Sequence, residues 1–284
     1  MIASYVGAKY ACSFNSASSA IFLAMLNKNV DVCIPSAIPH VVPNMLLNAG
    51  NTISFKDDVD WVGGSYVLHD FGEYKIIDSA QRLKENQFQD EANPNDLMIF
   101  SFYPTKPVGS CDGGIIVSDD LKKISWFRAA VNNGAVWSES SWDQKILFPG
   151  WKMYMSSIQA YIGKENFKQY GKKLERIAEI RETYNRELGY SNTSDHLYRI
   201  RVKYRQRFLG DLGRNHIAFG IHYYPLHMNH IYNDNISLNI LSPTLPKSER
   251  DRTTICSIPM HEKMDSSDVD FILKVISDHD LLVE

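Results

Sequence analysis

The stretch 100–117 carries the residue best suited to covalent chemistry, Lys106. An apolar strand end runs into a turn that holds Lys106, and the pair Gly113-Gly114 leads into a second apolar strand. An ammonium group beside aromatic rings and packed backbone loses hydration, so its pKa falls and it becomes available as an amine nucleophile. Schiff-base chemistry requires a desolvated lysine of this kind. The alternative is a surface lysine in a loop between two buried strands.

A second stretch, 10–26, could bind an anion. It is typical of a short buried strand (10–14), a turn of small polar residues (15–19) and an apolar helix (20–26). The first N–H groups of a helix have no partner, and the positive end of the helix dipole faces outward there. Small residues let a phosphate approach closely, and Ser18 or Ser19 can add a hydroxyl. An ordinary serine N-cap is the alternative.

The elements that must position these residues are many short strands, some of which alternate with helices. The strands are predicted at 10–14, 31–35, 52–55, 65–69, 75–78, 97–102 and 114–118. Short and nearly continuous apolar strands predict an α/β fold with a mostly parallel sheet covered on both faces. Ligands of such sheets lie at the carboxyl ends of strands. Five polar residues lie at or just past predicted strand ends: Ser18, His40, Asp78, Ser101 and Lys106.

The second half of the chain has a different pattern. A long charged helix is predicted to continue to residue 188, and a smaller α+β pattern follows, with strands at 196–202 and 217–224 and a closing helix at 266–276. We therefore predict two domains, residues 1–150 as a large ligand-binding domain and residues 151–284 as the long helix with a small α+β domain.

Composition excludes several classes of protein. The 284 residues carry a formal net charge of -3, which gives no indication of a nucleic-acid or polyanion partner. Four cysteines without C-x-x-C pairing are typical of buried thiols in a reducing compartment. No signal peptide is evident, and no apolar run approaches the roughly 20 residues that span a bilayer. We expect a cytoplasmic protein without a membrane partner.

Six stretches, taken in order, resemble the DegT/DnrJ/StrS family of fold-type I sugar aminotransferases, which depend on pyridoxal phosphate (PLP). Residues 100–106 match the family's F-S-F-H-x-x-K, and residues 112–114 fall where the family has E-G-G. Residues 76–81 match E-D-A-A-Q, and residues 15–20 match N-S-[GA]-T-x-A. Residues 220–227 and 256–261 match the G-I-x-x-x-x-H and L-S-L-P-x-H regions. Each match alone is weak, whereas the ordered set is specific and covers most of the chain.

The resemblance implies a task for each residue of the large-domain motifs. Lys106 would form a Schiff base with PLP and later move a proton, and Asp78 would pair with the pyridine nitrogen. Gln81 would hydrogen-bond the 3-oxygen of the ring. The phosphate would be held by Ser18, Ser101 and the backbone near Ala17. The alternatives are a helix N-cap for Asp78, a polar helix residue for Gln81, and for Ser101 a hydrogen bond to its own backbone.

The chain departs from the family pattern at four places. His40 stands where the family places an aromatic residue over the cofactor, and a helix-capping histidine is the alternative. Lys152 stands where the family has an asparagine that reaches the partner subunit's phosphate; it could contact phosphate by charge or lie on the surface. We expect a missing N-terminal segment, and shorter segments between 55 and 78 and after 188. The last two departures concern the sugar-nucleotide pocket.

The resemblance implies an aminotransferase that moves an amino group from an amino acid, with glutamate as the expected donor, to a keto-sugar nucleotide. It also implies a homodimer with shared active sites. The alternative is a shortened, non-catalytic homologue that acts as a PLP-binding or regulatory subunit. A metal site is not expected, because no acid or cysteine completes a set with His222, His227 and His230.

Overall fold

The computed structural model describes residues 1–137, 143–233 and 244–283, which form two compact units. The segments of the two units interleave along the chain. The first unit comprises Met1–Val32, Val41–Asn51 and Ser65–Lys168, and the second comprises Cys33–His40, Thr52–Gly64 and Gln169–Glu284. The two-domain division at residue 150 stays a prediction.

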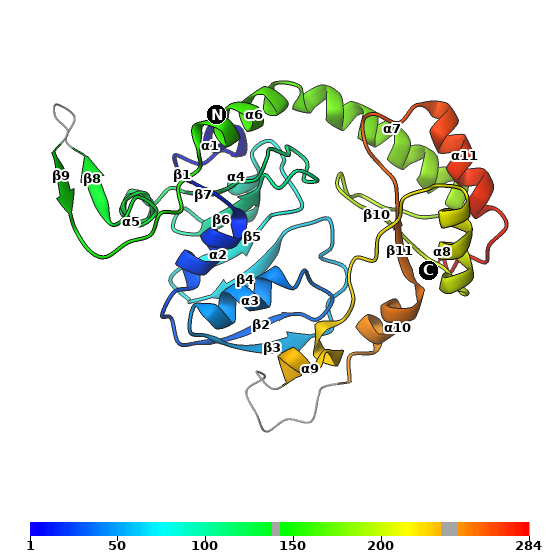
Figure 1. Ribbon diagram of the computed structural model, residues 1–284, viewed down its shortest axis with the longest axis horizontal. Helices are drawn as coiled ribbons and strands as arrows, with labels where there is room; N and C mark the ends of the chain where they lie inside the picture. Colours follow the sequence, from blue (N-terminus) through cyan, green and yellow to red (C-terminus); the bar gives the residue numbers. More distant parts are fainter. Residues whose placement is uncertain (138–142, 234–243, 284) are drawn as a thin grey trace. The chain divides into compact units, whose positions relative to one another are not determined.

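The first unit is built on a five-stranded sheet with the order β1-β7-β6-β5-β4 (Figure 1). The strands are β1 Tyr10–Phe14, β4 Tyr66–Asp70, β5 Lys75–Asp78, β6 Leu97–Ser101 and β7 Gly114–Ser118. The spans of β1, β5 and β7 match the predicted strands, and those of β4 and β6 differ from them by no more than one residue at either end. Apolar, β-branched runs such as Ile115, Ile116 and Val117 favour strands because they pack well on a pleated surface.

The prediction of a mostly parallel sheet is wrong for these five strands. Only β5 and β6 are parallel, whereas β1 with β7, β7 with β6, and β5 with β4 are antiparallel. Connection length explains the difference, because a parallel pair needs a crossover of about a dozen or more residues, usually helical. The β5–β6 connection contains a helix, but β4 and β5 are joined only by residues 71–74. The mixed α/β class that we predicted is confirmed.

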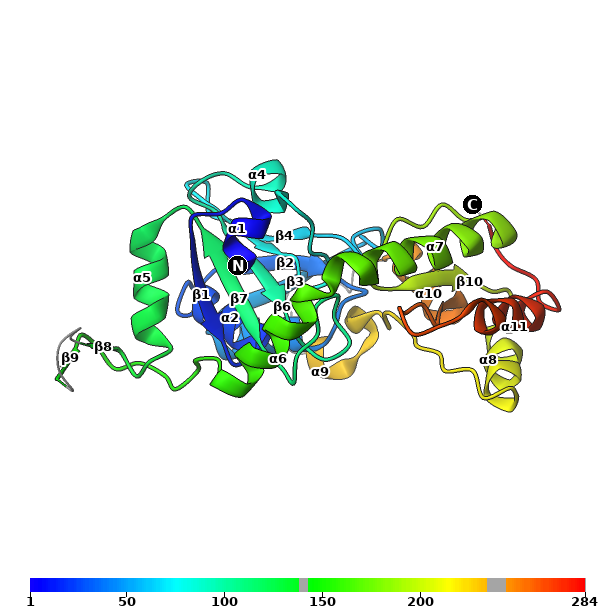
Figure 2. The same ribbon diagram turned by 90° about the horizontal axis from the view of Figure 1, so that it is seen from above.

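Helices cover this sheet from elements both early and late in the unit. Helix α2 (Ala17–Met25) packs on β6, β7 and β1, and α5 (Leu121–Ala130) packs on β1 and β7. Figures 1 and 2 show α5 beside β1 and the β8–β9 hairpin projecting beyond it. The other elements of the unit are α1 Ile2–Val6, α3 Val41–Asn48, α4 Gln87–Glu91, β8 Ala135–Trp137, β9 Gln144–Ile146 and α6 Ser157–Lys168.

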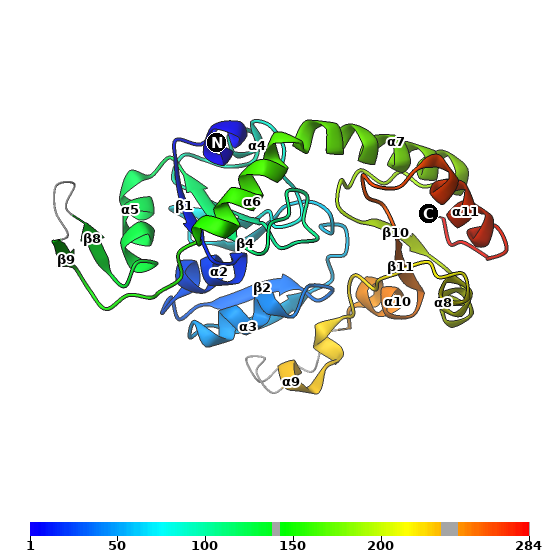
Figure 3. The ribbon, with the colours of Figure 1, turned by 45° about the horizontal axis from the view of Figure 1, so that its top comes forward.

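The second unit has its own apolar core around a two-stranded antiparallel sheet, β10 (Tyr198–Arg201) with β11 (Ile255–Ile258). Helix α7 (Tyr170–Leu188) buries Ile177, Ile180, Tyr184 and Leu188, a spacing that places them on one helical face. Helix α11 (Ser266–Ile276) lies beside α7 (Figure 3). The remaining elements of this unit are β3 Thr52–Lys56, α8 Arg205–Arg214, the 3-10 helix η1 Leu226–Met228, α9 His230–Asn233 and α10 Pro246–Thr254.

Two further predictions can be compared with these elements. Strand β2 (Asp31–Pro35), which is hydrogen-bonded to β3, matches its predicted span. The strand predicted at 217–224 is wrong, because Gly220 forms only an isolated bridge with Ser257 and the chain then turns away. Across the described residues, no helix combines the length and apolar character needed to cross a bilayer.

Gly114 is where the sheet and the start of α2 meet most closely. It faces Phe14 of β1 and Ser101 of β6 in the strand register. A Cβ atom at Gly114 would lie 2.5 Å from the backbone nitrogen of Ala17 and 2.7 Å from the carbonyl carbon of Ser16. Only a residue without a side chain therefore lets the helix start rest on the strand end.

We predict that Gly114→Ala lowers the free energy of unfolding by about 1–3 kcal/mol, because backbone atoms rather than a flexible side chain must move to admit the methyl group. The matched control is Gly171→Ala in α7, where an added Cβ would meet nothing within 4 Å. This control should be neutral or stabilising, since alanine is the better helix former. Urea unfolding of both variants checks the prediction, which is contradicted if the two changes are equal in sign and size.

Candidate functional site

Lys106 lies in the loop between β6 and β7, which is shaped by its own backbone hydrogen bonds. Lys106 N–H donates to the Tyr103 carbonyl (2.8 Å), and its carbonyl accepts from Gly109 N–H (2.9 Å). The base of the loop is closed by a bond from Phe102 N–H to the Gly113 carbonyl (2.8 Å). These turns hold Lys106 half-buried just past the end of β6.

Asp78 is the last residue of β5 and is 3% exposed. Its Oδ2 accepts a hydrogen bond from the Tyr66 hydroxyl (2.8 Å), and its Oδ1 accepts from Ala80 N–H (2.9 Å). Each carboxylate oxygen accepts one of these hydrogen bonds and can accept a second. The carboxylate therefore keeps lone pairs for a further partner. A buried carboxylate in this setting favours a cationic partner.

The charges of Asp78 and Lys106 act on each other. Burial raises the pKa of Asp78, while the hydrogen bonds from Ala80 and Tyr66 and the charge of Lys106 act against that rise. Burial lowers the pKa of Lys106, and the charge of Asp78 acts against that fall. The lowered pKa increases the share of neutral amine, which is the nucleophilic form.

The turn before α2 offers donors for an anion. Ser16 is the N-cap, and its Oγ accepts from Ser19 N–H (3.2 Å). The Ser19 hydroxyl donates to Asn15 Oδ1 (2.7 Å). Within the described residues the Ser18 hydroxyl makes no side-chain hydrogen bond, whereas the Ser19 hydroxyl is bonded to Asn15. Of the two serines, Ser18 is therefore the better candidate to bind an anion. Ser18 and the backbone of Ala17 therefore remain available at the positive end of the helix dipole.

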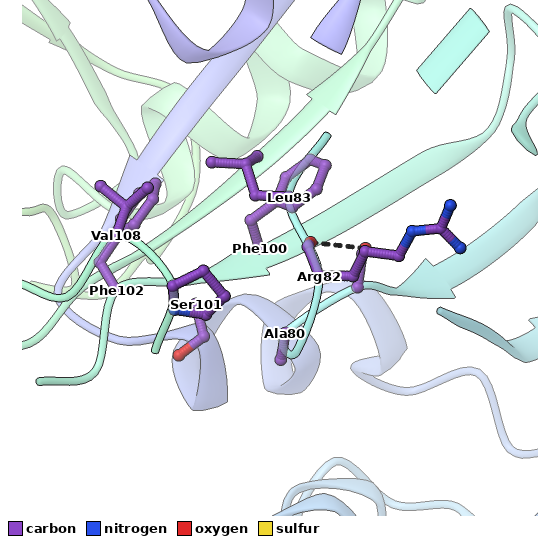
Figure 4. A pocket seen from close by; sticks show the side chains of 9 residues that line it. Ala80, Arg82, Leu83, Phe100, Ser101, Phe102 and Val108 are labelled. Atoms are coloured by element: carbon purple, nitrogen blue, oxygen red, sulfur yellow. Dashed lines mark hydrogen bonds between the residues drawn. The ribbon is translucent and has the colours of Figure 1, made fainter. Parts of the chain in front are cut away.

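Ser101 ends β6 and faces Gly114 across the strand pair. Its Oγ accepts a hydrogen bond from Tyr103 N–H (3.3 Å), as the alternative interpretation of this serine expected, and its own proton can still be donated. Figure 4 shows that the Ser101 hydroxyl points away from Phe100 and Leu83, with which it lines a small pocket. The segment after Asp78 and the Lys106 loop both contribute to this pocket, so the two segments pack together.

The other predicted residues differ in their surroundings. Gln81 is buried, at 3% exposed, and follows Asp78 by three residues in the chain. Lys152 is exposed and forms an isolated bridge with Asn132, still within the first unit. His40 belongs to the second unit, is exposed, and accepts a hydrogen bond on its carbonyl from Tyr232 (3.4 Å). The roles of Gln81, Lys152 and His40 stay predictions.

Helix α6 contributes three polar contacts that sequence reasoning missed. The Gln159 side chain donates to the Asn15 carbonyl (3.1 Å), and the Gln159 carbonyl accepts from the Ser110 hydroxyl (2.7 Å). Asn166 donates to the Gly109 carbonyl (2.6 Å). One helix is thus tied both to the anion turn and to the Lys106 loop. The sequence predicted only a long helix in this region and gave no signal for these three bonds, because each joins residues at least 49 positions apart.

Two of the three histidines considered for metal binding have other partners. The Nδ1 atom of His227 lies 2.5 Å from Ser36 Oγ, and that of His222 lies 2.8 Å from Ser257 Oγ. In the ranges that the structure describes, no group of three or more histidine, cysteine or acidic side chains is arranged to hold a metal ion.

Comparison with solved structures shows the fold. The chain superimposes on an aminotransferase, TlmJ from Streptoalloteichus hindustanus, with a TM-score of 0.79 at 18% identity, covering 98% of this chain and 88% of that one. PseC from Helicobacter pylori, an aminotransferase involved in the biosynthesis of pseudoaminic acid, gives 0.78 at 17% identity, with 98% and 88% covered.

Sequence comparison gives relatives of the same kind. The UDP-4-amino-4,6-dideoxy-N-acetyl-beta-L-altrosamine transaminase of Campylobacter jejuni is 25% identical over 323 aligned positions, covering 94% of this chain and 85% of the relative. Because the alignment is longer than the 284 residues of this chain, the relative carries segments that this chain lacks.

A family model assigns the chain directly. The model of the DegT/DnrJ/EryC1/StrS aminotransferase family matches residues 76–277, which include Asp78, Lys106 and most of the second unit. The resemblance of the sequence motifs is therefore confirmed, and the solved structures agree in fold. This chain belongs to the DegT/DnrJ/EryC1/StrS family of PLP-dependent sugar aminotransferases.

Proposed function

We propose that this protein transfers the amino group of an amino acid, with glutamate as the donor, to the keto group of a sugar nucleotide. The observation that carries the proposal is the electrostatic pairing of half-buried Lys106 with buried Asp78 at neighbouring strand ends. The relative from Campylobacter jejuni is named for a UDP-linked amino sugar, which supports a nucleotide-linked substrate for this chain as well.

The residues of the first unit fit PLP. A pyridine nitrogen that carries a proton suits the lone pairs that Tyr66 and Ala80 leave on Asp78, and a phosphate suits the start of α2 with the Ser18 hydroxyl. The absence of a side chain at Gly114 allows the helix start to lie directly over the ends of β6 and β7. The residues suited to the ring nitrogen, the phosphate and the amine thus come from two neighbouring strand ends and from the helix start that lies against Gly114.

When bound, PLP supplies an electron sink for the charge that develops as a proton leaves the amino acid. The protein's own residues do the rest. Asp78 would hold the proton on the ring nitrogen, Gln81 would hydrogen-bond the 3-oxygen, and Ser18, Ser101 and the Ala17 backbone would hold the phosphate. Lys106 would anchor the cofactor and, once released as a neutral amine, would move the proton of the substrate carbon. Lys152 and His40 would complete the phosphate contacts and the cover of the ring.

We also propose that two copies of the chain form a homodimer with shared active sites. Helix α6 buries none of its residues within the described chain, even though it carries large apolar side chains. Ile158 and Tyr161 are 71% and 66% exposed. Ile146 of the β8–β9 hairpin is 73% exposed. Three exposed large apolar side chains in neighbouring segments of the chain are typical of a protein–protein interface. Helix α6 also contacts the Lys106 loop and the anion turn.

Replacing the lysine tests the amine. Lys106→Ala should stay folded, lose covalent attachment of PLP, and convert glutamate about 100-fold to 10,000-fold more slowly, because both anchor and proton carrier are gone. Borohydride reduction followed by mass spectrometry of the Lys106 peptide measures attachment. Lys122→Ala, on the exposed start of α5, is the control and should match the wild type.

The same assay separates the two functional hypotheses. If wild-type protein attaches PLP at Lys106 but glutamate leaves its visible absorbance unchanged and yields no 2-oxoglutarate, the non-catalytic homologue is supported. If no PLP is attached at Lys106, the proposed function is abandoned.

Replacing the aspartate tests its charge. Asp78→Asn should keep PLP attached but lower turnover by about 100-fold to 1000-fold, because a neutral amide cannot hold the ring proton electrostatically. Asp96→Asn is the matched control. Asp96 is 2% exposed in the same unit, and its carboxylate likewise accepts backbone hydrogen bonds, from Lys75 (2.7 Å) and Asn93 (2.8 Å). Equal losses of turnover in both variants would contradict the assigned role.

Association is tested by placing a charge on α6. The wild type should be a dimer at micromolar concentration by light scattering, and Ile158→Glu should dissociate it because a charge would be buried without a partner. Lys164→Glu, an exposed position on the same helix, should leave the dimer intact. A monomeric wild type contradicts the dimer.

A further inference from the structure

The partner of Asp78 in this chain is a tyrosine on the neighbouring strand. Tyr66 of β4 faces Asp78 of β5 directly in the antiparallel register, and its hydroxyl donates to Oδ2 at 2.8 Å. Both residues are buried, at 7% and 3% exposed. A buried hydrogen bond to a charged group is stronger than one between neutral groups. The pair depends on the short antiparallel hairpin of β4 and β5.

An irregularity in the hairpin creates this pairing. Near the turn His69 faces Ile76, but the register shifts by one residue between Val67 and His69, so that Tyr66 faces Asp78 further along. If the register of the turn continued, Val67 would face Asp78, and valine has no hydrogen-bond donor. β-Bulges of this kind re-aim side chains, often beside active sites.

A buried polar network holds the shifted register. Ser65 and Ser79, the residues next to the pair, are joined through their hydroxyl oxygens at 2.9 Å. The amide of Gln87, from α4, donates to Ser79 Oγ at 2.6 Å and to Ser65 Oγ at 2.9 Å. Gln87 and Ser79 are 1% exposed, so breaking these bonds would leave buried polar atoms unsatisfied. The network therefore fixes the two strand ends that carry Tyr66 and Asp78.

We propose that Tyr66 is a positioning residue that orients the carboxylate of Asp78 and keeps it ionised for the ring nitrogen of the cofactor. This inference rests on the proposed function. A hydroxyl bonded to one oxygen restricts rotation of the carboxylate and fixes the direction of its remaining lone pairs. Tyr66 does not touch the reacting atoms in this scheme; it acts only through Asp78.

The pH dependence follows from the groups that face Asp78. Tyr66 comes from β4 and Lys106 from the β6–β7 loop, while β6 places the apolar Ile99 opposite Asp78. The Tyr66 bond and the Lys106 charge both favour the ionised carboxylate, against the burial that raises its pKa. Removing the hydroxyl raises the pKa of Asp78 further. Cofactor binding, which needs the ionised form, is then lost at a higher pH as the solution is acidified.

The test compares Tyr66→Phe with the wild type for PLP affinity across a pH series. We expect about tenfold weaker binding near neutral pH, the size of one hydrogen bond to a charged group, and an acid limit of binding moved to higher pH. Tyr74→Phe is the matched control. It removes a hydroxyl from the same hairpin, at a ring that stacks on Phe71 rather than facing Asp78, and should match the wild type.

A second variant distinguishes an effect on Asp78 from a simple folding defect of Tyr66→Phe. With 3-fluorotyrosine in place of Tyr66, the more acidic hydroxyl donates a stronger bond, so the acid limit of PLP binding should move to lower pH, opposite to Tyr66→Phe. A role in folding alone predicts no such opposite shift. Unchanged affinity and unchanged pH limits in both variants would overturn the inference.

A measurement without cofactor distinguishes failure of the proposed function from failure of the inference about Tyr66. The carboxyl 13C signal of Asp78 in the apoprotein reports its titration midpoint directly. If the wild type binds no PLP, the proposed function fails, and the inference about Tyr66 is then decided by whether Tyr66→Phe raises this midpoint. An upward shift supports the effect of Tyr66 on Asp78, and an unchanged midpoint overturns it.

Discussion

The structure of the site depends on keeping a carboxylate and an amine at the edge of one sheet, largely out of water. An isolated buried charge is costly, so Asp78 and Lys106 persist there only because each acts on the other and because Asp78 has two hydrogen-bond donors. The same desolvation lowers the pKa of Lys106, which favours its nucleophilic neutral form, and raises the pKa of Asp78, which works against its ionised form. Stability and reactivity therefore oppose each other at this edge, as is common at functional sites.

Connection lengths determine how the sheet presents that pair. The crossover that contains α4 makes β5 and β6 parallel, so Asp78 and the Lys106 loop leave the sheet at the same edge. The short turn of residues 71–74 folds β4 back as a hairpin. The hairpin places Tyr66 of β4 opposite Asp78 of β5, and the Tyr66 hydroxyl donates a hydrogen bond to the carboxylate.

Backbone contacts and polar bonds join the remaining parts of the site. Gly114 lets the start of α2 rest on the sheet, and Gln159 and Asn166 of α6 bind the anion turn and the Lys106 loop. Helix α6 buries none of its residues in the described chain, so these polar bonds account for much of its attachment to the site. Through these bonds, the surface that we propose for dimerisation contacts both the anion turn and the Lys106 loop of the proposed cofactor site.

The sequence by itself determined most local structure and the family to which the chain belongs. Apolar runs located the strands, and the order of short motifs predicted the family through Lys106, Asp78 and the turn at Ser18. Each of these signals is local, because the residues of one motif lie within a few positions of each other in the chain. Only the tertiary structure decided strand direction, the register shift that aims Tyr66 at Asp78, and the bonds of α6. Each of these depends on which distant residues come to lie opposite one another, and no local pattern records that.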